Sequence, residues 1–212
     1  MTTNNKIELM APAGNFESLQ AALDNGCDSV YFGVEQLNMR ARASVNFTMD
    51  DLAEIAKRCE AKNVRSYLTL NTIIYDHDLS VVKTLINKAK EANITAVIAS
   101  DQAVIAMARS VGMEVHISTQ LNVTNIETIK FYSLFADTMV LSRELSLRQV
   151  KKITEDIEKE QVKGPSGNLV EIEIFGHGAL CMAVSGKCYL SLHSHNSSAN
   201  RGACKQNCRK KY

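Results

Sequence analysis

Short runs of β-branched and aromatic residues alternate along the chain with longer stretches in which apolar residues recur every three to four positions. The short runs have the length and composition of buried strands, and the longer stretches have the period of amphipathic helices. In the stretch after Thr48, for example, one helical face would carry Leu52, Ile55, Ala56 and Cys59. The pattern predicts seven strands, at 7–13, 29–34, 65–71, 96–100, 114–119, 138–142 and 170–177.

Helix start and stop signals support the segments between these strands. Asn15 stands directly before FESLQAALDNG and Asp101 directly before QAVIAMARSVG, and both residue types are preferred helix N-caps. Gly26 and Gly112 follow these two segments, where a glycine commonly ends a helix. Thr48 precedes a further helical segment and has an acidic residue three positions on, which is a weak variant of the capping box.

Seven strands that alternate with six helices predict parallel βαβ units. The even spacing, about 20–35 residues per unit, favours a TIM-barrel-like (βα) repeat barrel over an open doubly wound sheet. No G-x-G-x-x-G sequence follows the first strand, which argues against a dinucleotide-binding fold. Because an eighth strand is missing, we expect the barrel to be incomplete and the chain to be a portion of a longer protein. The expected domains are a barrel-like domain at 1–178 and a cysteine-rich basic segment at 179–212.

Length and composition fit one sizeable hydrophobic core, since the chain has 212 residues of which 45% are hydrophobic. No run approaches the roughly 18 consecutive apolar residues of a membrane span. The N-terminus, MTTNNKIELM, is polar and lacks the apolar centre of a signal peptide. We therefore expect a cytoplasmic protein without a membrane partner, whose six cysteines do not form a disulfide framework.

The charge is distributed unevenly along the chain. Residues 1–173 carry a net charge of −5, and residues 174–212 carry +6. No acidic residue follows Glu173, whereas six basic residues do: Lys187, Arg201, Lys205, Arg209, Lys210 and Lys211. This density suits an anionic partner, of which nucleic acid is the commonest. A solvated basic tail is the alternative, and charge alone does not separate the two.

Polar residues follow several of the predicted strands. In βα barrels the chemistry gathers at the carboxyl ends of the strands, so these residues predict a ligand cavity on one rim. Each of them taken alone is more often a helix cap or a turn residue. Arg40 and Arg42, which follow the second strand, would add positive charge to the rim, unless they lie in a solvated loop. The polar strand ends are Asn71, Ser100, Asp101, Ser118, Thr119, Gln120, Asn122, Ser142, Arg143, Glu144 and His177.

Four cysteines fall within 28 residues near the C-terminus. Cys181, Cys188, Cys204 and Cys208 are spaced C-x6-C, x15 and C-x3-C. Several thiolates without a matching set of histidines suit an iron–sulfur cluster or zinc. The first pair is too wide for a zinc knuckle, so the spacing favours the cluster and leaves zinc and unligated thiols open. Cys27 and Cys59 differ, because their apolar surroundings predict small buried side chains.

The five histidines have different neighbours in the sequence. His177 lies close to the cysteines and would serve as a proton donor, a substrate contact, or a hydrogen-bonded residue at a strand end. Four positions separate it from Cys181, and that spacing alone does not indicate the Cys–His pair of a cysteine protease. His193 and His195 lie in LSLHSHNSSANRG, which we read as an exposed polar loop, and no neighbouring residues distinguish His77 or His116.

At these residues the chain resembles the peptidase U32 family. EIEIFGHGALCMAVSGKCYLS is similar to the family signature, and ANRGACKQNCRKKY is similar to its continuation. The resemblance extends upstream through ELMAPAGNFESLQAALDNGCDSVYFG, TQLNVTN and LSRELSL, and so covers nearly the whole chain. Within the family the chain is most similar to the subgroup that hydroxylates RNA bases, especially at the 5-hydroxyuridine step in tRNA. Sister members act on ribosomal RNA or on a quinone precursor.

The resemblance implies a 4Fe–4S cluster held by Cys181, Cys188 and Cys204. Cys208 would be the fourth ligand, unless that ligand comes from outside this segment as in some relatives. It also implies that tRNA is the partner and that the wobble uridine is hydroxylated. The alternatives are a peptidase or collagenase, hydroxylation of ribosomal RNA or a quinone precursor, and a structural metal module that only docks RNA.

The strand-end placement and the basic tail suggest roles for individual residues in that reaction. Arg143 and Glu144 would contact the base or the hydroxyl source, and His177 would carry a proton. Cationic residues of the tail would bind the phosphate backbone in a salt-sensitive manner. The expected substrate-binding residues are Asn71, Gln120, Asn122, Arg40, Arg42, Arg201, Lys205 and Arg209.

Overall fold

The computed structural model describes residues 7–34, 37–39, 47–178 and 181–209, so Arg40 and Arg42 lie outside the described residues. All seven predicted strands are present, and a helix lies between each consecutive pair. Several of the strands are shorter than predicted. The strands are β1 (Met10–Ala13), β2 (Ser29–Phe32), β3 (Arg65–Leu70), β4 (Ala96–Ala99), β5 (Glu114–Ile117), β6 (Thr138–Val140) and β7 (Glu171–Glu173). The helices are α1 (Phe16–Asp24), α2 (Leu52–Glu60), α3 (Leu79–Glu91), α4 (Gln102–Ser110), α5 (Ile126–Tyr132), α6 (Leu147–Glu160) and α7 (Leu190–His195).

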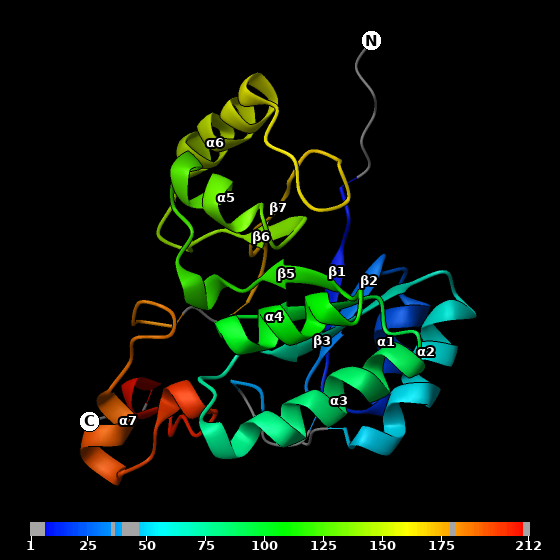
Figure 1. The fold of residues 1–212 in the computed structure, drawn as a ribbon. Coiled ribbons are helices and arrows are strands. Elements are labelled where there is room, and N and C mark those ends of the chain that lie inside the picture. The colour runs from blue at the N-terminus through cyan, green and yellow to red at the C-terminus, as the bar shows by residue number, and fades with distance from the viewer. Residues whose placement is uncertain (1–6, 35–36, 40–46, 179–180, 210–212) are drawn as a thin grey trace.

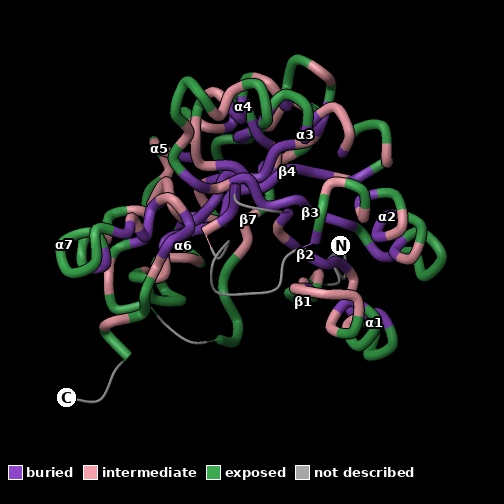
Figure 2. Tube along the Cα trace, turned by 90° about the horizontal axis from the view of Figure 1, so that it is seen from below, coloured by how far each residue is buried: buried purple, intermediate pink, exposed green. Residues whose placement is uncertain are grey.

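The sheet is parallel throughout, and its spatial order β1 to β7 is the order of the strands in the chain. Two neighbouring strands that run parallel must be joined by a crossover connection. Because these crossovers are all right-handed and the strand order never reverses, every connecting helix lies on the same face of the sheet. The strands therefore curl into a half-barrel with helices α1 to α6 on the outside (Figures 1 and 2). This confirms the TIM-barrel-like prediction and excludes an open doubly wound sheet, which has helices on both faces.

Alternate side chains of each strand face the helices and form the main core. On β3, Leu68 and Leu70 belong to this core, whereas Tyr67, which precedes them, belongs to a small second cluster with Ala96 and Ile98. Figure 2 shows the buried residues concentrated on the strands and on the helix faces turned toward them. Each fully buried aliphatic side chain contributes about 1.5–3 kcal/mol to stability. The packing of the helices against the sheet is therefore the main source of hydrophobic stabilisation in this fold.

The predicted helix signals occupy the predicted positions. Asn15 caps α1 and accepts from the backbone N–H of Ser18, whose hydroxyl in turn accepts from the Asn15 N–H in a reciprocal capping box. Asp101 caps α4 by accepting from the Ala103 N–H at 2.9 Å. Past the helix ends, Gly26 has φ of 78° and Gly112 has φ of 68°, a region that favours glycine.

The region 190–202 differs from the exposed polar loop expected from its sequence. Leu190–His195 forms helix α7, which ends at Asn196 with φ of 48°. A 3₁₀ turn at Ala199–Arg201 follows, and Asn200 within it is 5% exposed. His193 and His195 are exposed on α7, as expected. Among the described residues, no helix combines the length and the apolar character needed to cross a membrane.

His116 has neighbours that the sequence did not reveal. Its side chain is only 3% exposed, and its ring lies 4.6 Å from the ring of Tyr67 on β3. Its Nε2 atom lies 3.0 Å from the Glu114 carboxylate, and its Nδ1 atom lies 3.9 Å from Oε2 of Glu173 on β7. Because these residues come from three strands, the inside of the half-barrel carries a titratable cluster that no local pattern indicates.

Glu173 makes the stability of this cluster pH-dependent. Burial raises the pKa of its carboxyl above the usual 4.5, and the opposing charge of His116 only partly offsets that effect. A folded-state pKa above the unfolded value stabilises the protein below the unfolded pKa, and that contribution is lost as the pH rises through the folded pKa. Glu173→Gln should therefore match the parent near pH 4 and be more stable by on the order of 1 kcal/mol at pH 8. Urea unfolding across this range measures the difference, and a loss of stability at pH 8 would contradict it.

Candidate functional site at the carboxyl ends of the strands

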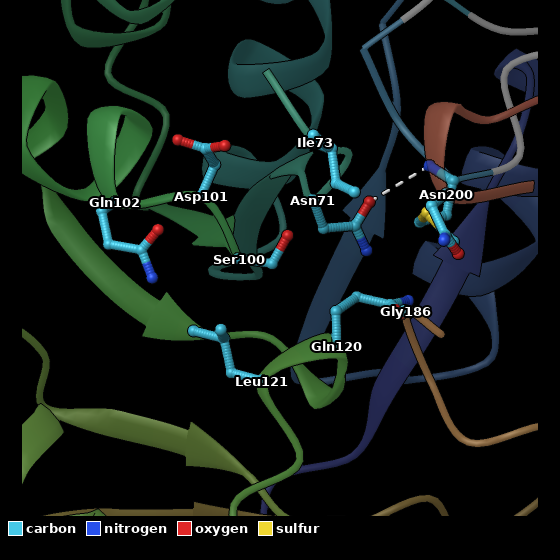
Figure 3. Close-up of a pocket in the computed structure, with 10 residues that line it drawn as sticks. Asn71, Ile73, Ser100, Asp101, Gln102, Gln120, Leu121, Gly186 and Asn200 are labelled. Atoms are coloured by element: carbon cyan, nitrogen blue, oxygen red, sulfur yellow. Dashed lines mark hydrogen bonds between the residues drawn. The ribbon is translucent and has the colours of Figure 1, made fainter. Parts of the chain in front are cut away.

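Residues that follow three neighbouring strands meet around one cavity. Asn71 follows β3, Ser100 follows β4 and Gln120 follows β5, and their side chains lie toward the centre of the view in Figure 3. The cavity has a volume of about 300 Å³. Its wall is completed by the rim residues Met39, Ile73, Asp101, Gln102 and Leu121, and by Gly186 and Asn200 from the C-terminal part of the chain. The structure thus places two of the expected substrate-binding residues, Asn71 and Gln120, on one cavity.

Backbone requirements explain several of these polar side chains. The Asp101 carboxylate accepts from the Ala103 N–H at the start of α4 and from the Ile74 N–H at 3.1 Å, so both its oxygens have backbone partners. Asn71 accepts from the Met39 N–H at 3.1 Å. Ser118 caps the short 3₁₀ turn Thr119–Leu121, which presents Gln120 to the cavity. Asp101 therefore has a structural role that leaves the amides as the main polar groups of the cavity.

Three buried amide oxygens near the cavity have no hydrogen-bond donor among the described residues. They are Oε1 of Gln120, Oδ1 of Asn200 and Oδ1 of Asn122. A buried acceptor without a donor costs about 1–3 kcal/mol, so such groups are normally satisfied by water or by a ligand. Gln120 and Asn200 line the cavity, and their oxygens are therefore suited to accept hydrogen bonds from a bound molecule.

Residues 181–209, called the cysteine segment below, pack against this rim and contribute Gly186 and Asn200 to the cavity wall. Asn122 donates from Nδ2 to the Ser185 carbonyl at 2.9 Å. Gly186 packs against Gln120 so closely that a Cβ atom at Gly186 would lie 3.0 Å from the Gln120 carbonyl oxygen. Gly186 also has φ of 70°, so both space and backbone conformation require glycine here.

Arg143, an expected catalytic residue at the end of β6, contacts the cysteine segment. Its Nη2 donates to the Ser185 hydroxyl at 2.7 Å and to the Ala183 carbonyl at 3.1 Å, and its Nη1 donates to the Cys181 carbonyl at 3.5 Å. Its Nε atom is buried and has no acceptor among the described residues. In this structure the guanidinium group therefore binds two backbone carbonyls and one hydroxyl of the cysteine segment.

Arg201, an expected phosphate contact, makes internal contacts of the same kind. Its guanidinium pairs with the Asp78 carboxylate, donates to the Ile73 carbonyl at 2.7 Å and lies 4.4 Å from the centre of the Tyr75 ring. Next to it, the Asn200 carbonyl accepts from the Ile73 N–H at 3.2 Å. In Figure 1 the orange and red end of the chain accordingly lies beside the beginning of α3.

The other expected site residues lie at the surface. Glu144 is exposed, and the hydroxyl of Ser142 donates to its carboxylate, which lowers the pKa of Glu144. His177 is exposed in the turn after β7. Lys205 and Arg209 are exposed on the cysteine segment, as is Lys187. All three cations are exposed to solvent, whereas Arg143 and Arg201 are only partly exposed.

The four cysteines of the segment are all free thiols in the structure. Cys181 and Cys208 are exposed, Cys188 and Cys204 are half-buried, and the Gln206 N–H donates to Sγ of Cys204 at 3.4 Å. Accessible thiols with an N–H donor to sulfur fit a soft metal centre in their chemistry. Within the described residues, however, no three His, Cys, Asp or Glu side chains form a group that could hold a metal ion. Cys27 and Cys59 are buried, as expected.

Comparison with known proteins gives consistent matches along the chain. The model of peptidase family U32 matches residues 14–212. A collagenase of Porphyromonas gingivalis is 58% identical over 208 residues, covering 98% of this chain and 50% of that protein. The tRNA hydroxylation protein P1 of Bacillus subtilis is 33% identical over 210 residues, covering 98% of this chain and 47% of that protein. The chain thus spans about half the length of the curated relatives that it matches.

A solved structure agrees with the fold. The U32 peptidase Mk0906 superimposes with a TM-score of 0.60 and 13% identity, covering 82% of this chain and 69% of that one. At this level of identity the match supports the shared half-barrel architecture alone.

The ion pair between Arg201 and Asp78 predicts an acid-sensitive attachment of the cysteine segment. The hydrogen bond from Arg201 lowers the pKa of Asp78 below its usual 3.8. A depressed folded-state pKa stabilises the protein above the unfolded pKa, and this contribution disappears as the pH falls through the folded value. Asp78→Asn should therefore lose about 1–3 kcal/mol at pH 7, and this difference from the parent should shrink toward about pH 2. Urea unfolding at the two pH values measures it, and a deficit that is independent of pH would contradict the assignment.

Proposed function

The chain belongs to peptidase family U32, and on this premise we propose that it forms the base-binding half of an enzyme that hydroxylates uridine in tRNA. The observation that carries the proposal is the cavity at the strand ends, which is lined by amides and bordered by a segment that bears four free thiols. The relative named for tRNA hydroxylation covers 98% of the chain, which supports the proposal.

The lining of the cavity suits an uncharged planar ring. Asn71, Gln120 and Asn200 offer amide groups, and one of the unsatisfied oxygens of Gln120 and Asn200 would accept from the single ring N–H of uridine. A base inside an RNA stack cannot reach such a site, so the target uridine would have to leave the stack, as in other base-modifying enzymes. The largely apolar and amide surroundings would then exclude water from the ring.

Exposed cations on the cysteine segment would bind the RNA backbone. Lys187, Lys205 and Arg209 are all exposed, and they belong to the part of the chain that carries the net charge of +6. Their contribution would be independent of sequence and would weaken as salt concentration rises. Arg143 and Arg201 are assigned to internal contacts instead.

The thiols of the cysteine segment would hold a 4Fe–4S cluster. Cys181, Cys188 and Cys204 are the proposed ligands, with Cys208 or a cysteine outside this chain as the fourth. Such a cluster supplies one-electron redox chemistry when it is bound. The described thiols do not form a group that could hold a metal ion in this structure. Cluster binding would therefore require a change in the conformation of the segment that brings the cysteines closer to one another. Glu144 and His177 are exposed and would exchange protons with solvent.

Peptide hydrolysis is the second candidate, because the 58% identical relative is named a collagenase. The described lining of the cavity contains no cysteine, histidine or lysine, and the oxygens of its one carboxylate, Asp101, have backbone partners. A peptidase needs a nucleophile or activated water together with a base, and these lining residues do not supply that pair. The chemistry of the cavity therefore favours the hydroxylase.

The proposal predicts that loss of the Cys188 thiol lowers both the iron content of the protein and the yield of hydroxylated uridine. In the full-length protein, purified without oxygen, Cys188→Ala should abolish most iron and acid-labile sulfide, the visible absorbance and the formation of 5-hydroxyuridine. Cys27→Ala is the matched control, because Cys27 is buried outside the segment and should leave all of these readings unchanged. Iron and sulfide analysis and mass spectrometry of digested tRNA are the measurements.

Other outcomes separate the alternatives. Zinc without sulfide would exclude the cluster, and tRNA binding without any altered nucleoside would indicate a docking module. Cleavage of collagen peptides that is lost on thiol alkylation, in protein without iron, would establish the peptidase instead.

A further inference from the structure

The cysteine segment reaches the half-barrel at two separate places, each built around one arginine. Arg143 meets it at residues 181–185, from the end of β6. Arg201, which belongs to the segment, reaches back to Ile73 and Asp78 after β3. We propose that these two arginines are positioning residues that clamp the segment over the cavity and thereby set the location of its thiols.

The first clamp depends on the fork geometry of an arginine. Its two terminal nitrogens satisfy three acceptors on the segment: the carbonyls of Cys181 and Ala183 and the hydroxyl of Ser185. Asn122 adds a bond to the Ser185 carbonyl, so Ser185 is held from the ends of both β5 and β6. A lysine ammonium at position 143 has the same charge but lacks the planar array of donors that spans these acceptors.

The second clamp combines a backbone bond with an ion pair. The Ile73 N–H donates to the Asn200 carbonyl, and Arg201 donates back to the Ile73 carbonyl. Asp78 neutralises the guanidinium, whose other face lies against the ring of Tyr75. This exchange joins residues 128 positions apart and fixes Asn200 in the wall of the cavity.

The clamps connect the thiols to the cavity. Cys181 lies in the first clamp, Cys188 lies between the two clamps, and Cys204 follows the second by three residues. Gly186 and Asn200, the two residues of the segment that line the cavity, lie next to the clamped residues Ser185 and Arg201. Loss of either clamp should therefore move a cysteine and open one side of the cavity.

The same contacts distinguish these arginines from RNA contacts. The terminal nitrogens of Arg143 donate to the segment and its Nε atom is buried, and Arg201 has a carboxylate partner, so both guanidinium groups are engaged within the protein. The inference holds whether or not the protein modifies RNA, because it depends only on how the segment is attached.

Amide hydrogen exchange in the full-length protein, read by mass spectrometry, tests the first clamp. Arg143→Lys and Arg143→Met should both accelerate exchange in residues 181–189 by about ten-fold or more, with helix α3 unchanged as an internal reference. Arg148→Met is the control, since Arg148 is exposed on α6 and its loss should leave that peptide as in the parent. The half-buried thiol of Cys188 should also react faster with iodoacetamide in both Arg143 variants, whereas buried Cys27 should not.

The second clamp gives a complementary result. Asp78→Asn and Arg201→Met should accelerate exchange in residues 197–204 more than in residues 181–189. If Arg143→Lys exchanged like the parent, charge alone would be sufficient and the clamp would be wrong. The clamp would also be wrong if Arg143→Met weakened binding of a tRNA while exchange in residues 181–189 stayed unchanged, because Arg143 would then be an RNA contact.

Discussion

The parallel pairing of seven consecutive strands is the constraint on which the other features of this structure depend. Because every strand runs in the same direction, every carboxyl end emerges on one rim, and residues separated by 20 to 30 positions in the chain become neighbours there. Asn71, Ser100 and Gln120 meet around one cavity for this reason. The connecting helices cover the outer face, and the interface between them and the strands supplies the hydrophobic core.

The rim serves two purposes, and the same strand ends provide for both. Some of its polar groups begin the next helix, as Asp101 does for α4. Others hold the cysteine segment, as Asn122 and Arg143 do. What remains for a ligand is a small set of amides, of which Gln120 and Asn200 keep unsatisfied oxygens. The chemistry that the cavity offers to a ligand follows from those amide groups.

The basic character of the C-terminal part has two physical meanings. Arg201 is neutralised by Asp78, so its charge is used within the protein. Lys187 and Lys205 are exposed on the same segment, where an anion in solution can reach them. The net charge of +6 is therefore larger than the charge that this part of the chain would present to RNA. Charge alone does not decide between the two candidate functions suggested by the relatives, one named a collagenase and the other a tRNA hydroxylation protein. The content of the cavity separates the two proposals more sharply.

The sequence by itself determined the seven strands, the six connecting helices and the caps at Asn15 and Asp101, because each depends on a period or a residue type within a few positions. It also indicated the rim residues Asn71 and Gln120, since strand ends of one barrel share an edge. Only the tertiary structure decided the partners of Arg143, Arg201 and His116. Those pairings join residues up to 128 positions apart in the chain, and contacts over such a distance produce no periodic pattern in the sequence. The helix α7 was missed because its six residues are too short to establish a period and are held by contacts with later residues, such as the bond from the Lys205 N–H to the Ser191 hydroxyl.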